Sequence, residues 1–219
     1  MKARIISNMK YNSIEEIIKN NQAWVAQKQA KDSTYFAEMS TGQKPPYLYI
    51  GCSDSRLALT RFTGTEPGEL FVHRNIANQV SLTDINFLAI LEYAVVHLEV
   101  KHIIVSGHYG CGGIKAALEG RSIGLVDNWV NPIREIYLQK KDEIDALPTQ
   151  EERLNRLAEM NVVMQVKNIY QTSVIRQALQ QQKAPEVHGW VVDISTGLIK
   201  NLHVLTKQWE LRSLSVAAL

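Results

Sequence analysis

The two cysteines of the sequence both lie in short polar stretches and not in apolar runs. Cys52 lies in GCSDSR, and Cys111 lies in SGHYGCGG together with His108. Thiolate sulfur and imidazole nitrogen suit zinc better than magnesium or calcium. A structural zinc site normally has four protein ligands, and neither stretch offers a third cysteine. The three residues therefore indicate a catalytic zinc site with an open fourth position, whereas the alternative is two small buried hydrophobic side chains.

Asp54 and Arg56 follow Cys52 at alternate positions. In an extended turn their side chains project to the same side and pair through two hydrogen bonds. Paired in this way, Asp54 stays off the metal and orients a zinc-bound hydroxide; released, it becomes a possible fourth ligand. An Asp-x-Arg pair alone is more often an ordinary surface ion pair. Its position next to Cys52 favours the functional interpretation.

The composition is that of a water-soluble globular protein. Of the 219 residues, 45% are hydrophobic and 21% are charged, and the net charge is +2. We expect a single domain over residues 1–219, with no nucleic acid as partner. No apolar run approaches the roughly 18 residues that cross a bilayer, and no signal-like stretch opens the sequence, so we expect no membrane partner and a cytoplasmic location. Cysteines far apart in that reducing compartment favour metal binding or catalysis.

The apolar pattern predicts strands that alternate with helices. Short β-favouring runs predict strands at Tyr47–Ile50, Leu70–His73, His102–Ser106 and Val187–Ile194, with Leu198–Leu205 as a hairpin partner of the last. Capping boxes and one apolar stretch predict helices over residues 14–30, 82–98 and from 149 to before Pro185. Residues 120–148 give the weakest pattern, and WVNPIREIY within them is interpreted as a helix that packs on another subunit.

This alternation predicts an α/β fold. We expect a mainly parallel sheet, in the order of about 2-1-3-4-5, with an antiparallel edge strand, flanking helices and an amino-terminal helical arm over about residues 13–41. In that order the first and third strands are neighbours. The turn with Cys52 then faces the turn with His108 and Cys111 at the carboxyl edge, where open α/β sheets bind ligands.

These motifs resemble the signature of the β-class carbonic anhydrases. CSDSR at 52–56 and HYGCGG at 108–113 carry the resemblance, and PGELFVHRNIANQV, LEYAVVHLEVKHIIVSGH and HGWVVDISTG extend it over most of the chain. The resemblance implies one zinc ion per chain on Cys52, His108 and Cys111. It also implies that Asp54 and Arg56 form a catalytic dyad, and that the protein is a homodimer or a dimer of dimers.

A substrate pocket is also implied by the resemblance. Gln43 takes the place of a glutamine whose amide donates to a substrate oxygen, and Phe71, Ile76 and Tyr93 take the places of apolar wall residues. Gly112 is interpreted either as a close-approach residue with its N–H near the metal or as a helix start. Taken alone, such residues are more often core or solvated positions.

One departure from the family concerns regulation. Some bacterial members hold a second, non-catalytic bicarbonate with a tryptophan, an arginine and a tyrosine, and those places here have Tyr49, Arg74 and Val192. Regulation through that pocket is therefore not expected, and Arg74 is expected in subunit or carboxylate contacts. The other histidines lack ligand spacing to the cysteines and are interpreted as structural or surface residues: His73, His97, His102, His188 and His203.

The function implied by the resemblance is reversible hydration of carbon dioxide to bicarbonate and a proton by zinc-bound hydroxide. A hydrolase of carbon disulfide or carbonyl sulfide with the same zinc site is the nearest alternative, and the motifs do not separate the two. A nucleotide or phosphate binder that uses GHYGCGGIK lacks the Gly-Lys-Ser/Thr end of a P-loop. A redox protein with a thiol pair is the third alternative.

Overall fold

The computed structural model describes residues 13–120 and 124–216. The chain divides into two compact units, Met1–Gln43 and Lys44–Leu219. The first unit contains α1 (Ile14–Lys31) and α2 (Tyr35–Met39). The side chain of Ser13 accepts a hydrogen bond from the Glu16 amide at 3.2 Å, so the predicted helix and its start at Ser13 are confirmed, whereas the reciprocal contact of a full capping box stays a prediction. The single domain with a helical arm stays a prediction.

Helix α1 buries none of its side chains within the described chain. Its only aromatic residue, Trp24, packs edge to face on Phe36, with ring centroids 5.4 Å apart, and three isoleucines on the helix are exposed, namely Ile14, Ile17 and Ile18. A helix with this much uncovered apolar surface is typical of a segment that meets another chain.

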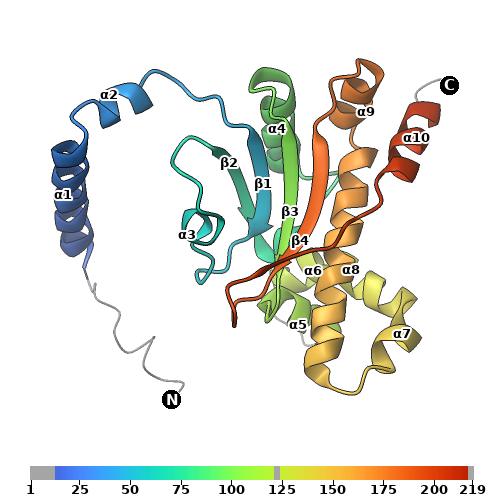
Figure 1. Cartoon of the computed structure of the whole chain (residues 1–219). Coiled ribbons are helices and arrows are strands. Elements are labelled where there is room, and N and C mark those ends of the chain that lie inside the picture. Colours follow the sequence, from blue (N-terminus) through green and yellow to red (C-terminus); the bar gives the residue numbers. More distant parts are fainter. Residues whose placement is uncertain (1–12, 121–123, 217–219) are drawn as a thin grey trace. The chain divides into compact units, whose positions relative to one another are not determined.

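The second unit is built on a five-stranded sheet in the order β2-β1-β3-β4-β5. Its strands are β1 (Tyr47–Cys52), β2 (Leu70–Asn75), β3 (His102–His108), β4 (Glu186–Val192) and β5 (Ile199–Asn201). The first four are parallel (Figure 1) and β5 is antiparallel to β4, so the predicted order and the antiparallel edge are confirmed.

The last two strands are shorter than predicted. Strand β4 ends at Val192 because Asp193 begins a turn, in which its carboxylate accepts from the Ser195 amide at 2.8 Å. Strand β5 ends at Asn201 because His203 has a left-handed backbone with φ of 46°, although the Leu202 amide still donates to the Gly189 carbonyl of β4 at 3.0 Å.

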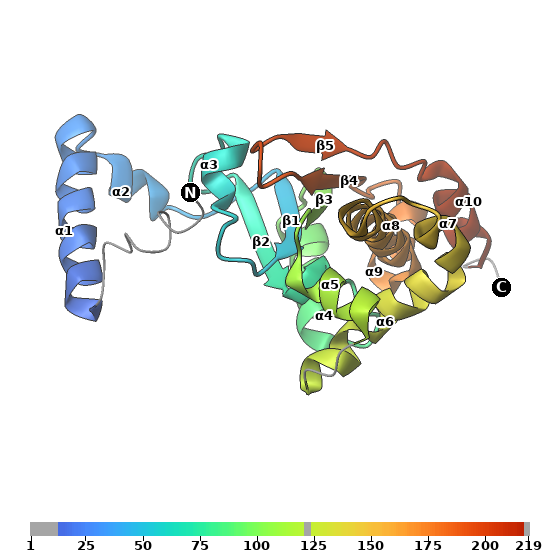
Figure 2. The ribbon, with the colours of Figure 1, turned by 90° about the horizontal axis from the view of Figure 1, so that it is seen from below.

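Helices α4 (Ile85–Glu92) and α8 (Gln150–Gln171) cover one face of the sheet (Figure 2). The main core joins alternate residues of the strands, such as Ile50 and Val105, to buried side chains of these helices, such as Phe87 and Val162. Helix α4 continues as a π-helical turn over Tyr93–His97, so the predicted apolar helix over 82–98 is confirmed in its central part.

A second core cluster lies at the carboxyl edge of the sheet. It contains α5 (Gly112–Glu119), α6 (Leu125–Gln139) and α7 (Lys141–Asp145), and α3 (Leu59–Thr63) follows β1. The stretch WVNPIREIY lies in α6, and its buried residues Val130, Ile133 and Ile136 pack within their own chain. The helix is confirmed, and its contact with another subunit stays a prediction.

The predicted long helical region is two helices, α8 and α9 (Ser173–Gln180), and the break lies at Thr172. Thr172 has an extended backbone (φ −71°, ψ 147°) and is only 3% exposed. Its hydroxyl donates to the Ile169 carbonyl at 2.8 Å and accepts from the Ile175 amide at 3.3 Å. One side chain therefore ends the first helix and caps the second.

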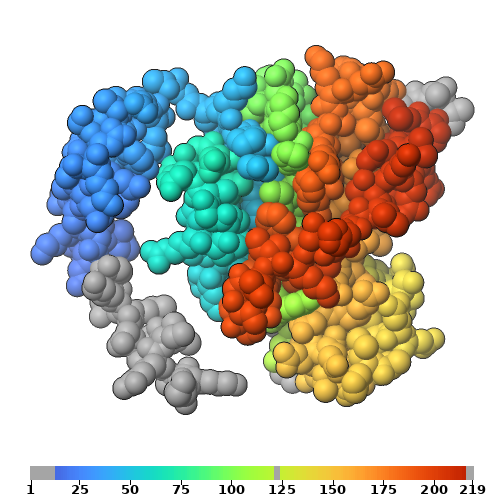
Figure 3. Space-filling model, in the orientation of Figure 1, coloured from blue at the N-terminus to red at the C-terminus, as the bar shows by residue number. Residues whose placement is uncertain are grey.

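The carboxyl-terminal helix α10 (Lys207–Val216) packs against α8 and α9, as the space-filling view shows (Figure 3). Ser213 donates to the Tyr170 carbonyl at 2.7 Å, and the rings of Tyr170 and Trp209 lie 6.3 Å apart. None of the described helices is long and apolar enough to cross a membrane.

Replacing Thr172 tests the junction between α8 and α9. Thr172→Val keeps the shape of the side chain but removes both hydroxyl contacts, so we expect it to lower the free energy of unfolding by about 1–2 kcal/mol. Urea unfolding at a fixed protein concentration measures the change. Thr172→Ser keeps the hydroxyl and serves as the control; a smaller loss in the valine variant than in the serine variant would contradict the capping role.

Candidate metal centre

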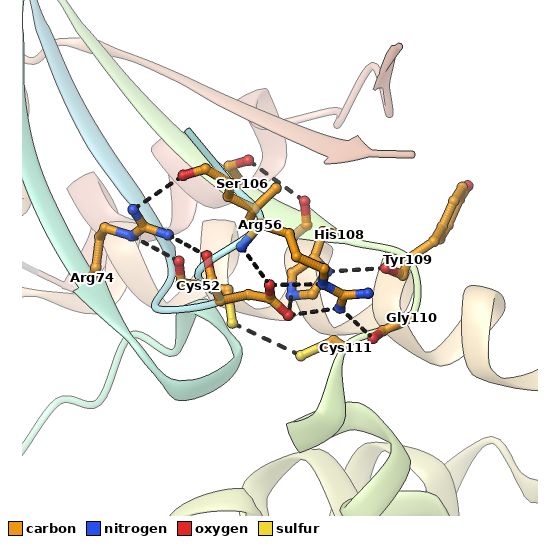
Figure 4. A network of polar contacts seen from close by, with 11 residues as sticks. Cys52, Arg56, Arg74, Ser106, His108, Tyr109, Gly110 and Cys111 are labelled. Atoms are coloured by element: carbon orange, nitrogen blue, oxygen red, sulfur yellow. Dashed lines mark hydrogen bonds and ion pairs between the residues drawn. The ribbon is translucent and has the colours of Figure 1, made fainter. Parts of the chain in front are cut away.

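The carboxyl ends of β1 and β3 bring the candidate ligands together. These strands pair in parallel, with Gly51 opposite Ser106, so Cys52 and His108 end their strands at the same edge of the sheet. Cys111 follows three residues later, at the amino end of α5. The close-up view shows the two sulfur atoms and the His108 ring converging from these segments (Figure 4).

The three side chains form a compact and buried group. Their candidate ligand atoms all lie within 4.8 Å of one another, and the two sulfur atoms are 3.9 Å apart. Cys52 and Cys111 are each 5% exposed and His108 is 1% exposed. Separations of this size fit ligands that share one ion at zinc–sulfur and zinc–nitrogen bond lengths of about 2.0–2.3 Å.

The ring of His108 has the orientation that a metal ligand needs. Its Nδ1 lies 3.0 Å from the carbonyl oxygen of Tyr109, so Nδ1 carries the proton and donates. The other nitrogen, Nε2, is buried and has no hydrogen-bond partner among the described residues. A buried nitrogen lone pair without a donor is costly, and a metal ion removes that cost. The donor set therefore fits zinc.

The two thiols lie too close together for both to ionise without a cation. The hydrogen bond between the two sulfur atoms lowers the pKa of Cys52. The same hydrogen bond, together with burial and the charge of Cys52, raises the pKa of Cys111. Zinc binds thiolates and not thiols, so binding at this group releases protons and makes metal affinity depend on pH.

Asp54 and Arg56 form the predicted two-pronged pair. Arg56 donates from Nε to Oδ1 of Asp54 at 2.9 Å and from Nη2 to Oδ2 at 2.7 Å, and it also reaches the Gly110 carbonyl at 3.1 Å. These hydrogen bonds from Arg56 lower the pKa of Asp54 to about 2. Oδ2 of Asp54 lies 3.8 Å from Nε2 of His108, so an ionised carboxylate stands beside the candidate ligands. The catalytic roles of the pair stay predictions.

Arg74 holds the loop that carries these residues. Its guanidinium donates to three backbone carbonyls, those of Cys52 at 2.8 Å, Asp54 at 2.8 Å and Leu57 at 3.2 Å. Subunit or carboxylate contacts were expected for Arg74, whereas these three hydrogen bonds go to the backbone of its own chain. Arg74 thereby fixes the path of the chain after β1.

The segment after β2 supplies a backbone donor that sequence reasoning missed. Ala77 has a left-handed backbone with φ of 60°, which is uncommon for alanine. Its amide lies against the sulfur of Cys52 and helps to lower the pKa of that thiol, and its carbonyl accepts from Asn161 at 3.0 Å. Backbone strain at functional positions persists where neighbours hold it in place. The stretch HRNIAN was noted only for its family resemblance.

A second missed feature anchors the loop between His108 and Cys111. The Tyr109 hydroxyl donates to Oε1 of Glu159 at 2.6 Å, and Lys200 donates to the same oxygen at 2.7 Å. Burial raises the pKa of Glu159, but these hydrogen bonds outweigh burial and the pKa is lowered overall. Glu159 belongs to α8 and Lys200 to β5, so no local sequence signal joins them to Tyr109.

The predicted substrate residues separate into two groups. Ile76 and Gly112 lie beside the metal centre: Gly112 begins α5, and a Cβ on the next residue, Gly113, would lie 3.0 Å from Cγ2 of Ile76. Phe71 and Tyr93 pair with each other, with ring centroids 5.8 Å apart.

Phe71 and Tyr93 lie away from Cys52 of their own chain. In the register of β1 and β2, Phe71 stands opposite Leu48, four residues before Cys52, a distance of about 13 Å along the strand. Gln43 is exposed in the first unit. Its role as an amide donor stays a prediction.

Tyr49 and Val192, which depart from the pattern of the regulated bacterial members, are both buried. The ring of Tyr49 lies over Gly51, where an added Cβ would lie 2.3 Å from ring atom Cε1. Burial raises the pKa of the Tyr49 hydroxyl. The absence of bicarbonate regulation through this pocket stays a prediction.

Known proteins resemble the chain over most of its length. A family model described as carbonic anhydrase matches residues 47–199. A carbonic anhydrase of Emericella nidulans is 44% identical over 190 residues, which cover 87% of this chain and 83% of that relative. One of two tetrameric β-carbonic anhydrases from Sordaria macrospora is 42% identical with a TM-score of 0.84, and the match covers 88% of this chain and 98% of that one.

The β-carbonic anhydrase CafA of Aspergillus fumigatus is 34% identical with a TM-score of 0.88, over 94% of this chain and 98% of that one. These matches span the segments that carry Cys52, His108 and Cys111. The chain belongs to the carbonic anhydrase family and has the fold of its β class.

Proposed function

We propose that this protein hydrates carbon dioxide reversibly to bicarbonate and a proton, with one zinc ion per chain held by Cys52, His108 and Cys111. The observation that carries the proposal is the buried Nε2 of His108, which has no hydrogen-bond partner among the described residues and faces two thiols. The Asp54 carboxylate stands beside this group, 3.8 Å from Nε2. The relatives reported above are named as carbonic anhydrases.

When bound, zinc supplies a Lewis acid that lowers the pKa of a coordinated water. Cys52 and Cys111 bring two negative charges, which partly cancel the charge of the ion. Less acidification is therefore expected than at a site of three neutral histidines, where that pKa is about 7. Hydration activity should accordingly rise toward mildly alkaline pH.

Asp54 is the proposed orienting group for the nucleophile. Its carboxylate is ionised at neutral pH, because the Arg56 hydrogen bonds lower its pKa to about 2. It can therefore accept a hydrogen bond without becoming protonated. An oxygen nucleophile that donates its hydrogen to Asp54 aims its lone pair elsewhere, toward the carbon of the substrate. The Arg56 side chain holds the carboxylate by two hydrogen bonds. If these two bonds break, Asp54 becomes free to act as a fourth metal ligand.

We further propose that the protein assembles as a homodimer or a dimer of dimers through β2. Strand β2 is an edge strand, and Val72 on it is 42% exposed. Exposed edges are templates for pairing with another chain. Tetrameric relatives from Sordaria macrospora support an assembly of this kind.

Pairing through β2 also accounts for the distance between the two groups of pocket residues. If two copies of β2 pair antiparallel about a two-fold axis, the Phe71 end of one strand lies beside the Asn75 end of the other. Asn75 stands opposite Cys52 in the register of β1 and β2. Phe71 and Tyr93 of one copy would then supply the apolar wall near the metal centre of the other, together with Ile76 and Gly112 of that second copy.

Two further expectations go with this function. Carbon dioxide is the proposed substrate, and assays with carbonyl sulfide and carbon disulfide distinguish it from the hydrolase that the motifs leave open. The cytoplasmic location stays a prediction.

Replacing Asp54 tests the reaction. We expect Asp54→Asn to lower carbon dioxide hydration by about 100-fold or more, with the zinc content per chain unchanged, because the neutral amide lacks the negative charge and the second oxygen through which Arg56 orients the acceptor. Stopped-flow assays from about pH 6.5 to pH 9 measure the rate, and elemental analysis measures zinc. Asp142→Asn, at an exposed carboxylate on α7, is the matched control.

Two results would count against this function. Stoichiometric zinc without carbon dioxide hydration at any pH would favour the alternative function, hydrolysis of carbonyl sulfide or carbon disulfide. Absence of zinc would remove the metal centre altogether. Asp54 is ionised throughout the range because its pKa is about 2, so an alkaline rise in the native protein must come from another group.

Replacing Arg74 tests how the ligand loop is positioned. Arg74→Ala leaves three backbone carbonyls without their donor, and we expect zinc to be held about 10- to 100-fold more weakly. Competition with a chromophoric chelator measures zinc retention. Arg61→Ala, at an exposed arginine on α3, is the control and should retain zinc like the native protein. Equal retention in both variants would show that Arg74 does not position the ligands.

Replacing Val72 tests the assembly through β2. We expect Val72→Arg to give monomers and to lower hydration while zinc is retained, because a charge on the edge strand opposes pairing and removes the partner's Phe71 and Tyr93. Analytical ultracentrifugation and stopped-flow assays measure the two effects. Val163→Arg, at a valine on α8 that is 36% exposed, is the control. A monomeric variant with full activity would contradict the shared pocket.

A further inference from the structure

Three side chains that could hold a metal ion also meet at the opposite, amino edge of the sheet. His102 is the first residue of β3 and stands opposite Glu186, the first residue of β4. His188 lies two residues after Glu186, so it points to the same face of the sheet. Both histidines were expected to be structural or surface residues, because neither has ligand spacing to the cysteines.

The distances within this group match those between the ligands of a single ion. Nδ1 of His102 lies 3.1 Å from Nε2 of His188 and 3.6 Å from Oε2 of Glu186, and Nε2 of His188 lies 3.8 Å from the same oxygen. A point equidistant from three atoms so arranged lies about 2 Å from each, the length of zinc–nitrogen and zinc–oxygen bonds in proteins.

The surroundings favour a ligand role over a simple hydrogen bond between rings. The ring of Tyr47 stacks on that of His102, with centroids 5.4 Å apart and planes 24° apart, and thereby fixes its orientation. Burial lowers the pKa of His188, which favours the neutral ring that binds metals. The side chains of His102, His188 and Glu186 are 35%, 31% and 70% exposed, so an ion can enter from solvent and keep water ligands.

We propose that His102, Glu186 and His188 form a second metal site, which binds a divalent transition-metal ion with zinc as the expected occupant. Two imidazoles and one carboxylate prefer such ions to magnesium or calcium. His102 begins and His108 ends the seven-residue strand β3, so the two residues are about 20 Å apart and this site is separate from the cysteine centre. An ion held there would join the amino ends of β3 and β4.

Calorimetric titration of Zn²⁺ into the protein that already carries its zinc tests the proposal. We expect about one further ion per chain in a non-coordinating buffer near neutral pH. Glu186→Gln removes the charged ligand from an exposed position without disturbing the core, and His188→Ala removes a ring ligand; each should weaken this second binding about tenfold or more. His203→Ala, at an exposed histidine after β5, should bind like the native protein.

Absence of a further binding event in the native protein would overturn the proposal, and so would unchanged binding in both ligand variants. The measurement does not depend on the proposed reaction. A protein that hydrates no carbon dioxide can still show the second event, and an active enzyme can lack it. Thermal unfolding with and without added Zn²⁺ gives a second readout, in which the metal raises the Tm of the native protein but not that of Glu186→Gln.

Discussion

The parallel pairing of β1 with β3 is the constraint on which the metal centre depends. Cys52 and Cys111 are far apart along the chain, and only the adjacency of the two strands brings their sulfur atoms to 3.9 Å. Apolar side chains that are fully buried, such as Ile50 and Val105, fix the register. A slip by one residue would move Cys52 by about 3.3 Å and turn it to the other face of the sheet. The packing of the core therefore sets the geometry of the site.

Backbone amides in the loops around the candidate metal centre stabilise negative charge on the buried cysteine sulfur atoms. The amide of Ala77 lies against the Cys52 sulfur, and the amides of Gly113 and Ile114 in the first turn of α5 lie against Cys111. Helix amino ends and backbone amides of this kind stabilise thiolates. They do not suffice for two charges, since the pKa of Cys111 is still raised while Cys52 carries the first. A divalent cation held at this group would supply what the amides lack and would also accept the lone pair of His108.

The sequence was enough to predict the strands and the positions of Cys52, His108 and Cys111 at strand ends, because strand-ending motifs and hydrophobic runs are local signals. The structure confirms the expected strand order, and the role of these three residues as ligands stays a prediction. The sequence did not reveal contacts that form only on folding. Arg74 was expected in subunit or carboxylate contacts, and its hydrogen bonds to the backbone after β1 form only when β1 and β2 lie side by side. Glu159 meets Tyr109 only through the packing of α8 on the sheet. The break at Thr172 was missed for a different reason: the helical pattern continues on both sides of a residue that contributes two hydrogen bonds.

The two edges of the sheet show how one arrangement can produce different kinds of site. In parallel strands, residues at one level and on one face meet regardless of their separation in sequence. At the carboxyl edge the ligand candidates are buried thiols and an imidazole, enclosed by loops that carry an ionised carboxylate, and this enclosure suits chemistry that must exclude bulk water. At the amino edge the side chains of His102, Glu186 and His188 are partly open to solvent, and the ring of Tyr47 stacks on that of His102. Such openness suits reversible binding of an ion, with the strands serving as a rigid frame.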